Sequence, residues 1–182
     1  MDPAESVDAG IVTLRRWDPA WVEDLDEAIR ASLPELKRFM PWATDDHGLQ
    51  ESRGYVVKSV GEWDARENWN YAMFSADERV IGSCRLMTGM GPGVLEIGYW
   101  VRTDHSGRGY ATAAGTALAK VGLRVAGIER VAIKHDLANT ASGRVAAKAG
   151  FTQVAQIETE PQAAGETGIQ LLWERRLAAD PL

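Results

Sequence analysis

A glycine turn in the middle of the chain constrains the fold more than any other feature of the sequence. The apolar stretch Leu95–Val101 (LEIGYWV) runs through Gly107-Arg108-Gly109 directly into the alanine-rich segment Gly109–Ala126. Small and apolar side chains recur in that segment at the spacing of one helix face. A strand followed by a tight turn and a helix is typical of an α/β fold, in which the helix covers a face of the sheet.

The turn also has the properties of an anion-binding site. The first N–H groups of a helix lack partners, the positive end of the helix dipole lies beside them, and glycine lets a ligand approach the backbone. Arg108 adds a positive charge, and the small side chains of Ala111, Ala114 and Gly115 let the helix lie close to the sheet. The turn therefore predicts a bound anionic group, and a tight turn without a ligand is the alternative.

Two common phosphate-binding loops do not match this turn. A Walker loop requires G-x-x-x-x-G-K-[ST], and the chain contains no Gly-Lys-Ser or Gly-Lys-Thr. A dinucleotide fingerprint requires a third glycine three residues after the second, where this chain has Thr112. The sequence thus excludes a P-loop nucleotidase and argues against a Rossmann domain.

The remaining pattern predicts a single α/β domain over residues 1–182, with loose ends at 1–10 and 178–182. Helices are expected after Asp18-Pro19, in a short segment around Pro34, and over Leu49–Trp63, Gly109–Ala126 and Asn139–Ala149. Strands are expected over Ile11–Trp17, Tyr71–Ser75, Val80–Met87, Val94–Arg102, Arg130–Lys134, Gly150–Ile157 and Ile169–Leu177. Three of these strands follow one another as a meander, so we expect a mixed, mostly antiparallel sheet flanked by helices.

Composition restricts the class of protein further. With 45% hydrophobic and 25% charged residues, the chain is typical of a globular domain, and no stretch approaches the roughly 18 apolar residues of a membrane span. The segment Met1–Gly10 is acidic, unlike a secretory signal. A net charge of −6 argues against nucleic-acid binding. The single cysteine, Cys84, and three scattered histidines give no disulfide and no metal-ligand spacing. We therefore expect a cytoplasmic protein with no metal, membrane or nucleic-acid partner.

Two segments resemble the GNAT superfamily of acyl-CoA-dependent N-acyltransferases. The loop pattern of that family is [QR]-x-x-G-x-[GA], and residues 104–109 (DHSGRG) match both glycine positions, with Asp104 in place of the leading Gln or Arg. The segment Asn139–Phe151 resembles the N-x-x-S-x-x-V-x-x-K-x-G-F signature of the RimJ/RimL branch, the ribosomal-protein N-terminal acetyltransferases. The order of elements, with Glu96–Val101, Arg38–Trp42 and Leu171–Trp173, extends the resemblance over nearly the whole chain.

The resemblance implies acetyl-CoA as co-substrate and indicates where it binds. In such enzymes the pantetheine arm pairs with the strand before the loop, which implies contacts with Trp100 and Val101. The pyrophosphate lies on the loop N–H groups, here those of Ser106, Gly107, Arg108, Gly109, Tyr110 and Ala111. Asn139 is expected to bind the pantetheine or a nearby water, or only to cap its own helix. Lys148 lies where a side chain faces the cofactor.

Transfer also requires a group that protonates the departing thiolate. In many relatives a tyrosine seven residues after the matching Asn139 supplies this acid, but Ala146 stands at that position. Ser142, on the same helix, is the remaining candidate, and a helix cap or a surface hydroxyl is its alternative role.

Glu96 is the expected acceptor of the amine proton, because it interrupts an otherwise apolar strand. Strand alternation places it on one face with Gly98 and Trp100. The alternative is a structural ion pair with an arginine such as Arg85. A bound-water chain ending at Glu96 or His135 would serve the same purpose, although His135 is expected to be a surface loop residue.

The leading functional hypothesis is an N-acetyltransferase that acts on an amine, with a protein N-terminus as the favoured acceptor. An α-amine titrates near 8 and a lysine near 10.4, so about 300 times more of the α-amine is neutral at neutral pH. A small-molecule acyltransferase, for instance of an antibiotic or polyamine, is the alternative enzyme. A non-catalytic CoA-sensing module is the alternative of another class, because Asp104, Ala113 and Ala146 depart from the family pattern.

The acceptor groove is expected from two segments of the chain, Leu33–Asp46 and the region near Gly89–Gly93. Trp42, Trp63 and Trp69 fall in or beside the elements that form the acceptor side in the family. Core packing accounts for most tryptophans in such positions. A homodimer is compatible with the resemblance.

Overall fold

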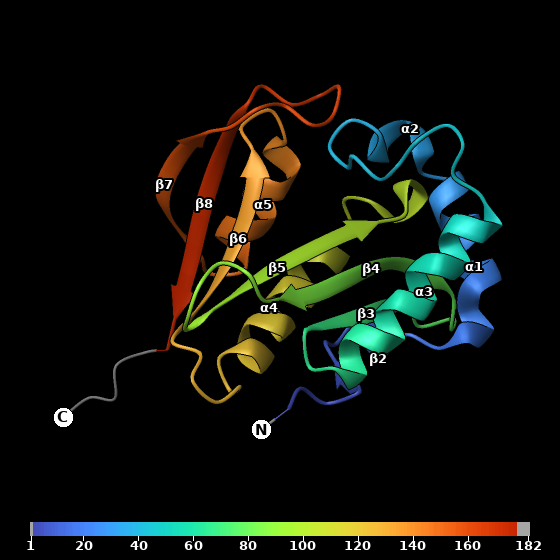
Figure 1. Ribbon diagram of the computed structural model, residues 1–182, viewed down its shortest axis with the longest axis horizontal. Coiled ribbons are helices and arrows are strands. Elements are labelled where there is room, and N and C mark those ends of the chain that lie inside the picture. The colour runs from blue at the N-terminus through green and yellow to red at the C-terminus, as the bar shows by residue number, and fades with distance from the viewer. Residues whose placement is uncertain (1, 178–182) are drawn as a thin grey trace.

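The computed structural model describes residues 2–177, which form one open sheet of eight strands with helices on both faces (Figure 1). The strands are β1 (Ser6–Asp8), β2 (Thr13–Arg16), β3 (Asn68–Phe74), β4 (Val80–Met87), β5 (Val94–Val101), β6 (Arg130–Asp136), β7 (Thr152–Glu158) and β8 (Ile169–Arg176). The helices are α1 (Val22–Arg30), α2 (Leu33–Leu36), α3 (Leu49–Asp64), α4 (Tyr110–Gly122) and α5 (Thr140–Lys148), with short 3-10 turns at Pro19–Trp21 and Thr103–His105.

The strand order is β1-β2-β3-β4-β5-β6-β8-β7. All neighbouring strands run antiparallel except β5 and β6, which are parallel because α4 crosses over between them. This confirms the expected mixed, mostly antiparallel sheet. The meander predicted over residues 71–102 is β3, β4 and β5, and the helix predicted after the glycine turn is α4.

The N-terminal segment differs from the expectation that residues 1–10 are loose. Ser6–Asp8 form β1, which pairs with β2, and Ala9 N donates to Val12 O at 2.9 Å across the turn. Gly10 adopts φ +82°, a left-handed conformation that glycine takes without steric cost, and Asp8 Oδ1 accepts from Gly10 N. Val7 packs against the main hydrophobic core. The predicted loose end at 178–182 lies outside the described residues.

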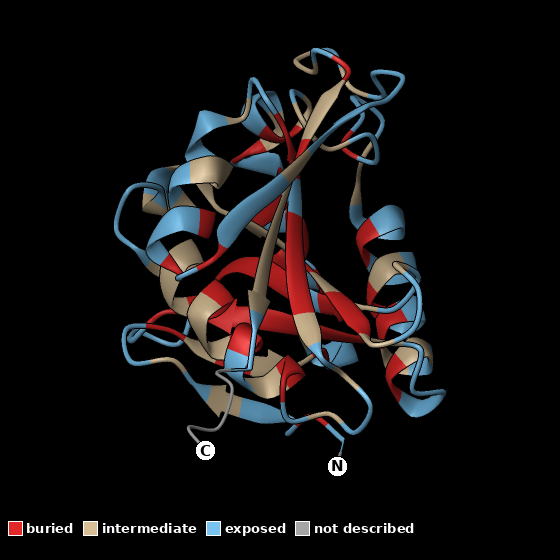
Figure 2. Ribbon diagram, turned by 90° about the vertical axis from the view of Figure 1, so that its left-hand side faces the viewer, coloured by how far each residue is buried: buried red, intermediate tan, exposed pale blue. Residues whose placement is uncertain are grey.

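Strand alternation divides the core into two parts, one on each face of the sheet. On one face, α4 packs through Ala114 and Leu118 against side chains such as Leu95 of β5. On the other face, α1, α2 and α3 pack against Ala72 and Phe74 of β3. Figure 2 shows the buried residues concentrated in the middle of the sheet, between the helical layers.

The described part of the chain offers neither a metal-ligand cluster nor a helix suited to cross a membrane. Among residues 2–177 no three His, Cys, Asp or Glu side chains gather as metal ligands would, and no helix is both long and apolar enough to span a bilayer. Cys84 is buried in the core, where burial raises the pKa of its thiol. It therefore acts as a small apolar side chain, as expected.

Candidate functional site

The candidate site begins where the parallel strands β5 and β6 separate. Their ladder pairs Val94 with Arg130, Leu95 with Val131 and Glu96 with Ala132, and it ends there. Beyond this point β5 continues along β4, and β6 continues along β8. The β5 peptide groups from Ile97 onward that face β6 therefore have no strand partner among residues 2–177. A cleft of about 1040 Å³ opens at this separation.

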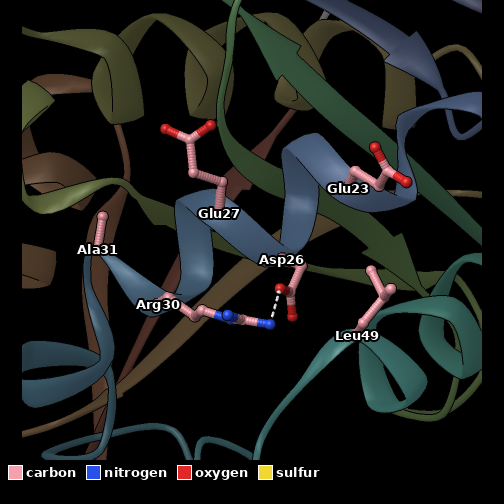
Figure 3. A pocket seen from close by; sticks show the side chains of 6 residues that line it. All are labelled: Glu23, Asp26, Glu27, Arg30, Ala31 and Leu49. Atoms are coloured by element: carbon pink, nitrogen blue, oxygen red, sulfur yellow. Dashed lines mark ion pairs between the residues drawn. The ribbon is translucent and has the colours of Figure 1, made fainter.

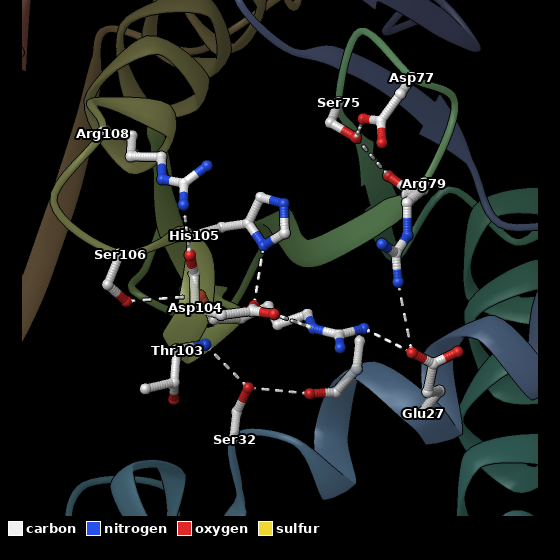
Figure 4. A network of polar contacts seen from close by, with 12 residues as sticks. Glu27, Ser32, Ser75, Asp77, Arg79, Thr103, Asp104, His105, Ser106 and Arg108 are labelled. Atoms are coloured by element: carbon white, nitrogen blue, oxygen red, sulfur yellow. Dashed lines mark hydrogen bonds and ion pairs between the residues drawn. The ribbon is translucent and has the colours of Figure 1, made fainter.

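The cleft brings together all but one of the residues predicted for catalysis or cofactor binding. Its lining includes Glu96, Trp100, Val101, Ser106, Gly107, Gly109, Tyr110, Ala111, Asn139, Ser142 and Lys148. Arg108 is the exception, because its exposed side chain folds back over the loop and its Nη2 donates to Asp104 O at 2.9 Å (Figure 4). The guanidinium of Arg108 thus closes the loop from outside.

The glycine loop has the backbone geometry that an anion site requires. Gly107 and Gly109 adopt φ of +76° and +88°, conformations in which other residues are strained. Gly109 is the N-cap of α4, and the first intrahelical hydrogen bond runs from Ala113 N to Gly109 O. The N–H groups before Ala113 therefore have no acceptor within the helix, and Tyr110, Ala111 and Thr112 line the cleft.

Asp104, the departure from the family pattern, does not line the cleft. Its carboxylate accepts from Arg102 Nε at 2.9 Å and from the Nδ1–H of His105 at 2.8 Å (Figure 4). The hydrogen bond from His105, together with the charge of Arg102, holds the pKa of Asp104 below its usual range. Asp104 thus shapes the loop, and its negative charge is offset by two neighbouring groups.

The same network ties the loop to the helical layer of α1 and α2. Arg102 Nη1 donates to Glu27 of α1 at 2.9 Å, and Thr103 N donates to the buried Ser32 Oγ at 3.0 Å. Thr103 Oγ1 donates to Glu35 of α2 at 3.1 Å. The loop is therefore held against α1 and α2.

Glu96 lies at the point where the strands part, and its neighbour differs from the expected one. Lys134 Nζ of β6 lies 3.7 Å from Glu96 Oε2. Arg85, the expected partner, stands opposite Gly98 and lies over it, with Nε 3.2 Å from the position of a Cβ there. Glu96 pairs instead with Met87 across the ladder. The ion pair with Arg85 is therefore wrong, because the register places Arg85 two pairs along the ladder from Glu96.

Ser142 lies in the first turn of α5, where Asn139 caps the helix. Asn139 Oδ1 accepts from Ser142 N at 3.2 Å, which leaves the side-chain amide of Asn139 as a donor in the cleft. Ser142 Oγ lies 2.8 Å from the hydroxyl of Tyr99 in β5. Burial raises the pKa of Tyr99 to about 12, and the hydrogen bond with Ser142 lowers it in part. Ala146, at the position of the family tyrosine, is fully buried in the core.

Sequence reasoning missed Tyr99 because alternation places it on the apolar face of its strand. The available signal was a hydroxyl group on that apolar face, three residues beyond Glu96, the last β5 residue that pairs with β6.

His135 is buried in β6, which corrects the expectation of a surface loop residue. Trp173 Nε1 is only a donor, so its 3.0 Å contact assigns His135 Nε2 as the acceptor. His135 Nδ1 then donates to Asp136 O at 2.8 Å. The ring also packs against Gly143, where a Cβ would lie 3.2 Å from it. Both ring nitrogens are engaged, so the imidazole lies in the cleft wall without a free lone pair.

Aromatic side chains line the side of the cleft where the acceptor groove is expected. Trp42, with 41% of its surface exposed, lies 6.2 Å from Trp100 and 5.7 Å from His47 between ring centroids. The expected segment 33–46 contributes here, but residues 89–93 do not line the cleft. Trp63 and Trp69 are core residues.

Two further segments complete this side of the cleft. Tyr55 of α3 and Glu166 of the loop before β8 both line it. Gly165 N of that loop donates to Arg38 O at 2.9 Å, which joins it to the segment after α2.

A second hollow, of about 540 Å³, lies between α1 and the start of α3 (Figure 3). Its charged lining includes Glu23, Glu27 and an ion pair between Arg30 and Asp26 at 2.6 Å. None of the residues predicted for the site lies there, so the larger cleft is the candidate site.

The open mixed sheet, with two parallel strands that separate beside a glycine-led helix N-terminus, has the geometry expected of a CoA-dependent acyltransferase. The sequence itself matches the family model of the acetyltransferase (GNAT) domain over residues 12–152. The chain therefore belongs to the GNAT family and is an acyl-CoA-dependent N-acetyltransferase. Among proteins with curated functions, none matches the chain by sequence.

Solved structures of low sequence identity share the fold. The microcin C7 self-immunity acetyltransferase MccE, in complex with acetyl-CoA and AMP, superposes with a TM-score of 0.87 at 18% identity, over 95% of this chain and 97% of that one. The ribosomal L7/L12 α-N-protein acetyltransferase RimL, in complex with CoA, gives 0.87 at 22% identity, over 97% and 100%. RimJ of Mycobacterium smegmatis, in complex with CoA-disulfide, gives 0.85 at 21% identity, over 97% and 90%.

Proposed function

We propose that this protein transfers the acetyl group of acetyl-CoA to a primary amine, with a protein N-terminal α-amine as the favoured acceptor. The observation that carries the proposal is the position of two groups on opposite faces of β5. Glu96 shares the face of Trp100, which packs with the α1–α3 core, whereas Ser142 enters the cleft beside Tyr99 on the α4 side. A base for the amine and a donor for the thiolate are thus available at one opening.

The cleft is suited to acetyl-CoA in shape and charge. The unpaired edge of β5 at Trp100 and Val101 offers peptide groups to the pantetheine amides, as a further strand would. The loop from Ser106 to Ala111 offers N–H groups and the α4 dipole to the pyrophosphate. Asn139 offers its amide donor, and the exposed Lys148 offers a positive charge to the phosphates.

In the proposed reaction the neutral amine attacks the thioester carbon, so the C–N bond forms as the C–S bond breaks. The electron pair of the C–S bond goes to sulfur, where the Ser142 hydroxyl donates a hydrogen bond. The surplus proton of the amine leaves through Glu96, directly or through water. An α-amine asks less of this base than a lysine does, because a much larger share of the α-amine is neutral near pH 7. The similarity to RimL, a ribosomal L7/L12 α-N-protein acetyltransferase, supports this acceptor class.

A small-molecule amine is the second candidate acceptor. The exposed ring of Trp42 beside Trp100 offers a flat aromatic surface on the acceptor side, which suits a planar ligand group. The MccE structure, which holds AMP together with acetyl-CoA, supports the same candidate. A panel of amines, with release of the CoA thiol as readout, separates the possibilities. Peptide N-termini should be acetylated faster than lysine side chains or small amines, and no thiol release with any amine would contradict the enzymatic proposal.

Cofactor binding is tested at Gly109. Because φ at Gly109 is +88°, a valine there strains the turn and displaces the N–H groups of α4. We expect Gly109→Val to weaken CoA binding at least tenfold in calorimetry. Gly127→Val is the matched control, because Gly127 also has a positive φ, +81°, but lies outside the cleft. Equal CoA affinity in a folded Gly109→Val protein would show that the site is misplaced.

A further inference from the structure

The hydroxyl of Tyr99 lies across the cleft opening from α5, at a position that the family pattern leaves without an assigned role. It is 2.8 Å from Ser142 Oγ and 3.3 Å from Ser142 O. The tyrosine that many relatives carry on this helix is replaced by Ala146, which is packed in the core with no exposed surface. A phenol therefore reaches Ser142 from the neighbouring strand instead of from the helix.

We propose that Tyr99 is a positioning residue that orients the Ser142 hydroxyl toward the thioester sulfur. The inference rests on the proposed function, in which Ser142 is the donor to the thiolate. When the Tyr99 O–H donates to Ser142 Oγ, the single proton of Ser142 is free to point elsewhere. Among residues 2–177, Ser142 Oγ has no other hydrogen-bond partner, so its proton can be directed into the cleft.

The direction of this hydrogen bond follows from the chemistry of the two groups. A phenol is a stronger acid than an aliphatic alcohol, so donation from Tyr99 to Ser142 is the favoured sense. Within α5 the carbonyl oxygen of Ser142 already faces the N–H of Ala146, four residues further along the helix. The Oγ of Ser142 is also closer to the Tyr99 hydroxyl than this carbonyl oxygen is, so Oγ is the better acceptor. Because the Tyr99 ring is largely buried, the phenol stays protonated over the neutral range and remains a donor.

The reaction step balances without consuming either hydroxyl. The C–S bond breaks, its electron pair goes to sulfur, and the O–H of Ser142 stabilises the charge by a hydrogen bond. The amine loses one proton through Glu96, and the thiolate finally takes up one proton, so the protons of the reaction balance. Tyr99 polarises Ser142 in this step, since hydrogen bonds in a chain strengthen one another.

A double-mutant cycle tests the proposal by acetyl transfer. We expect Tyr99→Phe to lower kcat about tenfold, with CoA affinity and thermal stability close to those of the parent, because the ring is kept. In a Ser142→Ala background the same change should have no further effect, since the partner is absent. Tyr71→Phe, which removes a core hydroxyl bonded to Ala4 O, is the matched control and should leave kcat unchanged. A tenfold loss that persists in the Ser142→Ala background, or an unchanged kcat in Tyr99→Phe, would overturn the proposal.

A second measurement needs no amine acceptor. In the complex with CoA, Ser142 should stabilise the thiolate, so the thiol should titrate about half to one pH unit lower in the parent than in Tyr99→Phe or Ser142→Ala, as followed by thiolate absorbance. Equal titration in all three proteins would refute the role of Tyr99. If the parent acetylates no amine but shows this difference, the proposed function fails while the positioning role stands.

Discussion

At the scale of single residues, Glu96 is the side chain whose surroundings decide its role. Its carboxylate is 19% exposed, and its partner Lys134 is 40% exposed and 3.7 Å away. An ion pair with one well-exposed member contributes about 0–1 kcal/mol to stability. So weak a contribution does not by itself account for a carboxylate within an apolar strand, which supports a chemical role.

Glu96→Gln keeps the size of the side chain and removes the basic carboxylate. Turnover should fall by up to the ~10²–10⁴-fold that general base catalysis supplies, and less for an α-amine than for a lysine acceptor. The rate of the variant should recover in part at alkaline pH, where more of the amine is neutral. Steady-state kinetics over a pH series measures both effects.

Lys134→Gln is the companion variant, because it breaks the same ion pair and keeps the carboxylate. It should retain much more turnover than Glu96→Gln at matched CoA saturation. If both variants lose stability equally and turn over like the parent, Glu96 serves only the ion pair.

At the scale of elements, the approach of α4 to the sheet is set by its last residue. The sequence pattern attributed this approach to Ala111, Ala114 and Gly115, and Ala114 is indeed fully buried. A Cβ at Gly115 would meet only Ala149 Cβ, at 3.9 Å, whereas a Cβ at Gly122 would lie 2.8 Å from Val131 Cγ1. The tightest contact thus lies at the C-terminal end of α4, far from the glycine loop.

Gly122→Ala should destabilise the protein, because the added methyl group overpacks the contact with Val131. Overpacking costs about 1–3 kcal/mol and outweighs the gain in helix propensity of up to ~1 kcal/mol. Gly115→Ala should be neutral or stabilising, because its methyl group would lie at an ordinary van der Waals distance from Ala149 Cβ. Urea unfolding of both variants measures the difference, and equal stability would contradict the packing argument.

At the scale of the whole molecule, Asp136 joins distant segments at the end of β6. It is 3% exposed, and its carboxylate accepts from Ala138 N, Thr167 N, Thr167 Oγ1 and Gly168 N at 2.8–3.1 Å. Burial alone raises the pKa of Asp136, but these hydrogen bonds outweigh it and hold the pKa below its usual value. The loop before β8, which closes the acceptor side, therefore depends on a charged aspartate.

Stability should reflect this group in acid. Since the folded pKa lies below the unfolded one, near 3.9, its contribution is present above about pH 4 and is lost as pH falls further. Asp136→Asn should lower the thermal midpoint at neutral pH and flatten its decline below about pH 4. Asp46→Asn, in an exposed loop, is the control and should follow the parent. A decline in acid as steep in Asp136→Asn as in the parent would contradict this role.

Local sequence patterns predicted most of the elements and the glycine loop beside the cleft. Helix periodicity, strand alternation and the two glycines of the loop are local properties, so α4, β5 and the Gly109 cap follow from neighbouring residues. The same reasoning predicted that Glu96 and Trp100 share a face. It failed at the N-terminus, where the alternation in Ser6–Asp8 was too short to separate β1 from a loose end.

Which side chains meet in the cleft depends on contacts between distant segments of the chain. Tyr99 contacts Ser142 from 43 positions away, and Trp173 contacts His135 from 38 positions away. Glu96 meets Lys134, and not Arg85, because the register of three strands sets their distance. Such contacts depend on pairing between segments far apart in the chain, where a shift of one residue reverses every face. Local patterns carry no information on that register, and the part of the cleft around Glu96, Tyr99 and Ser142 is built from it.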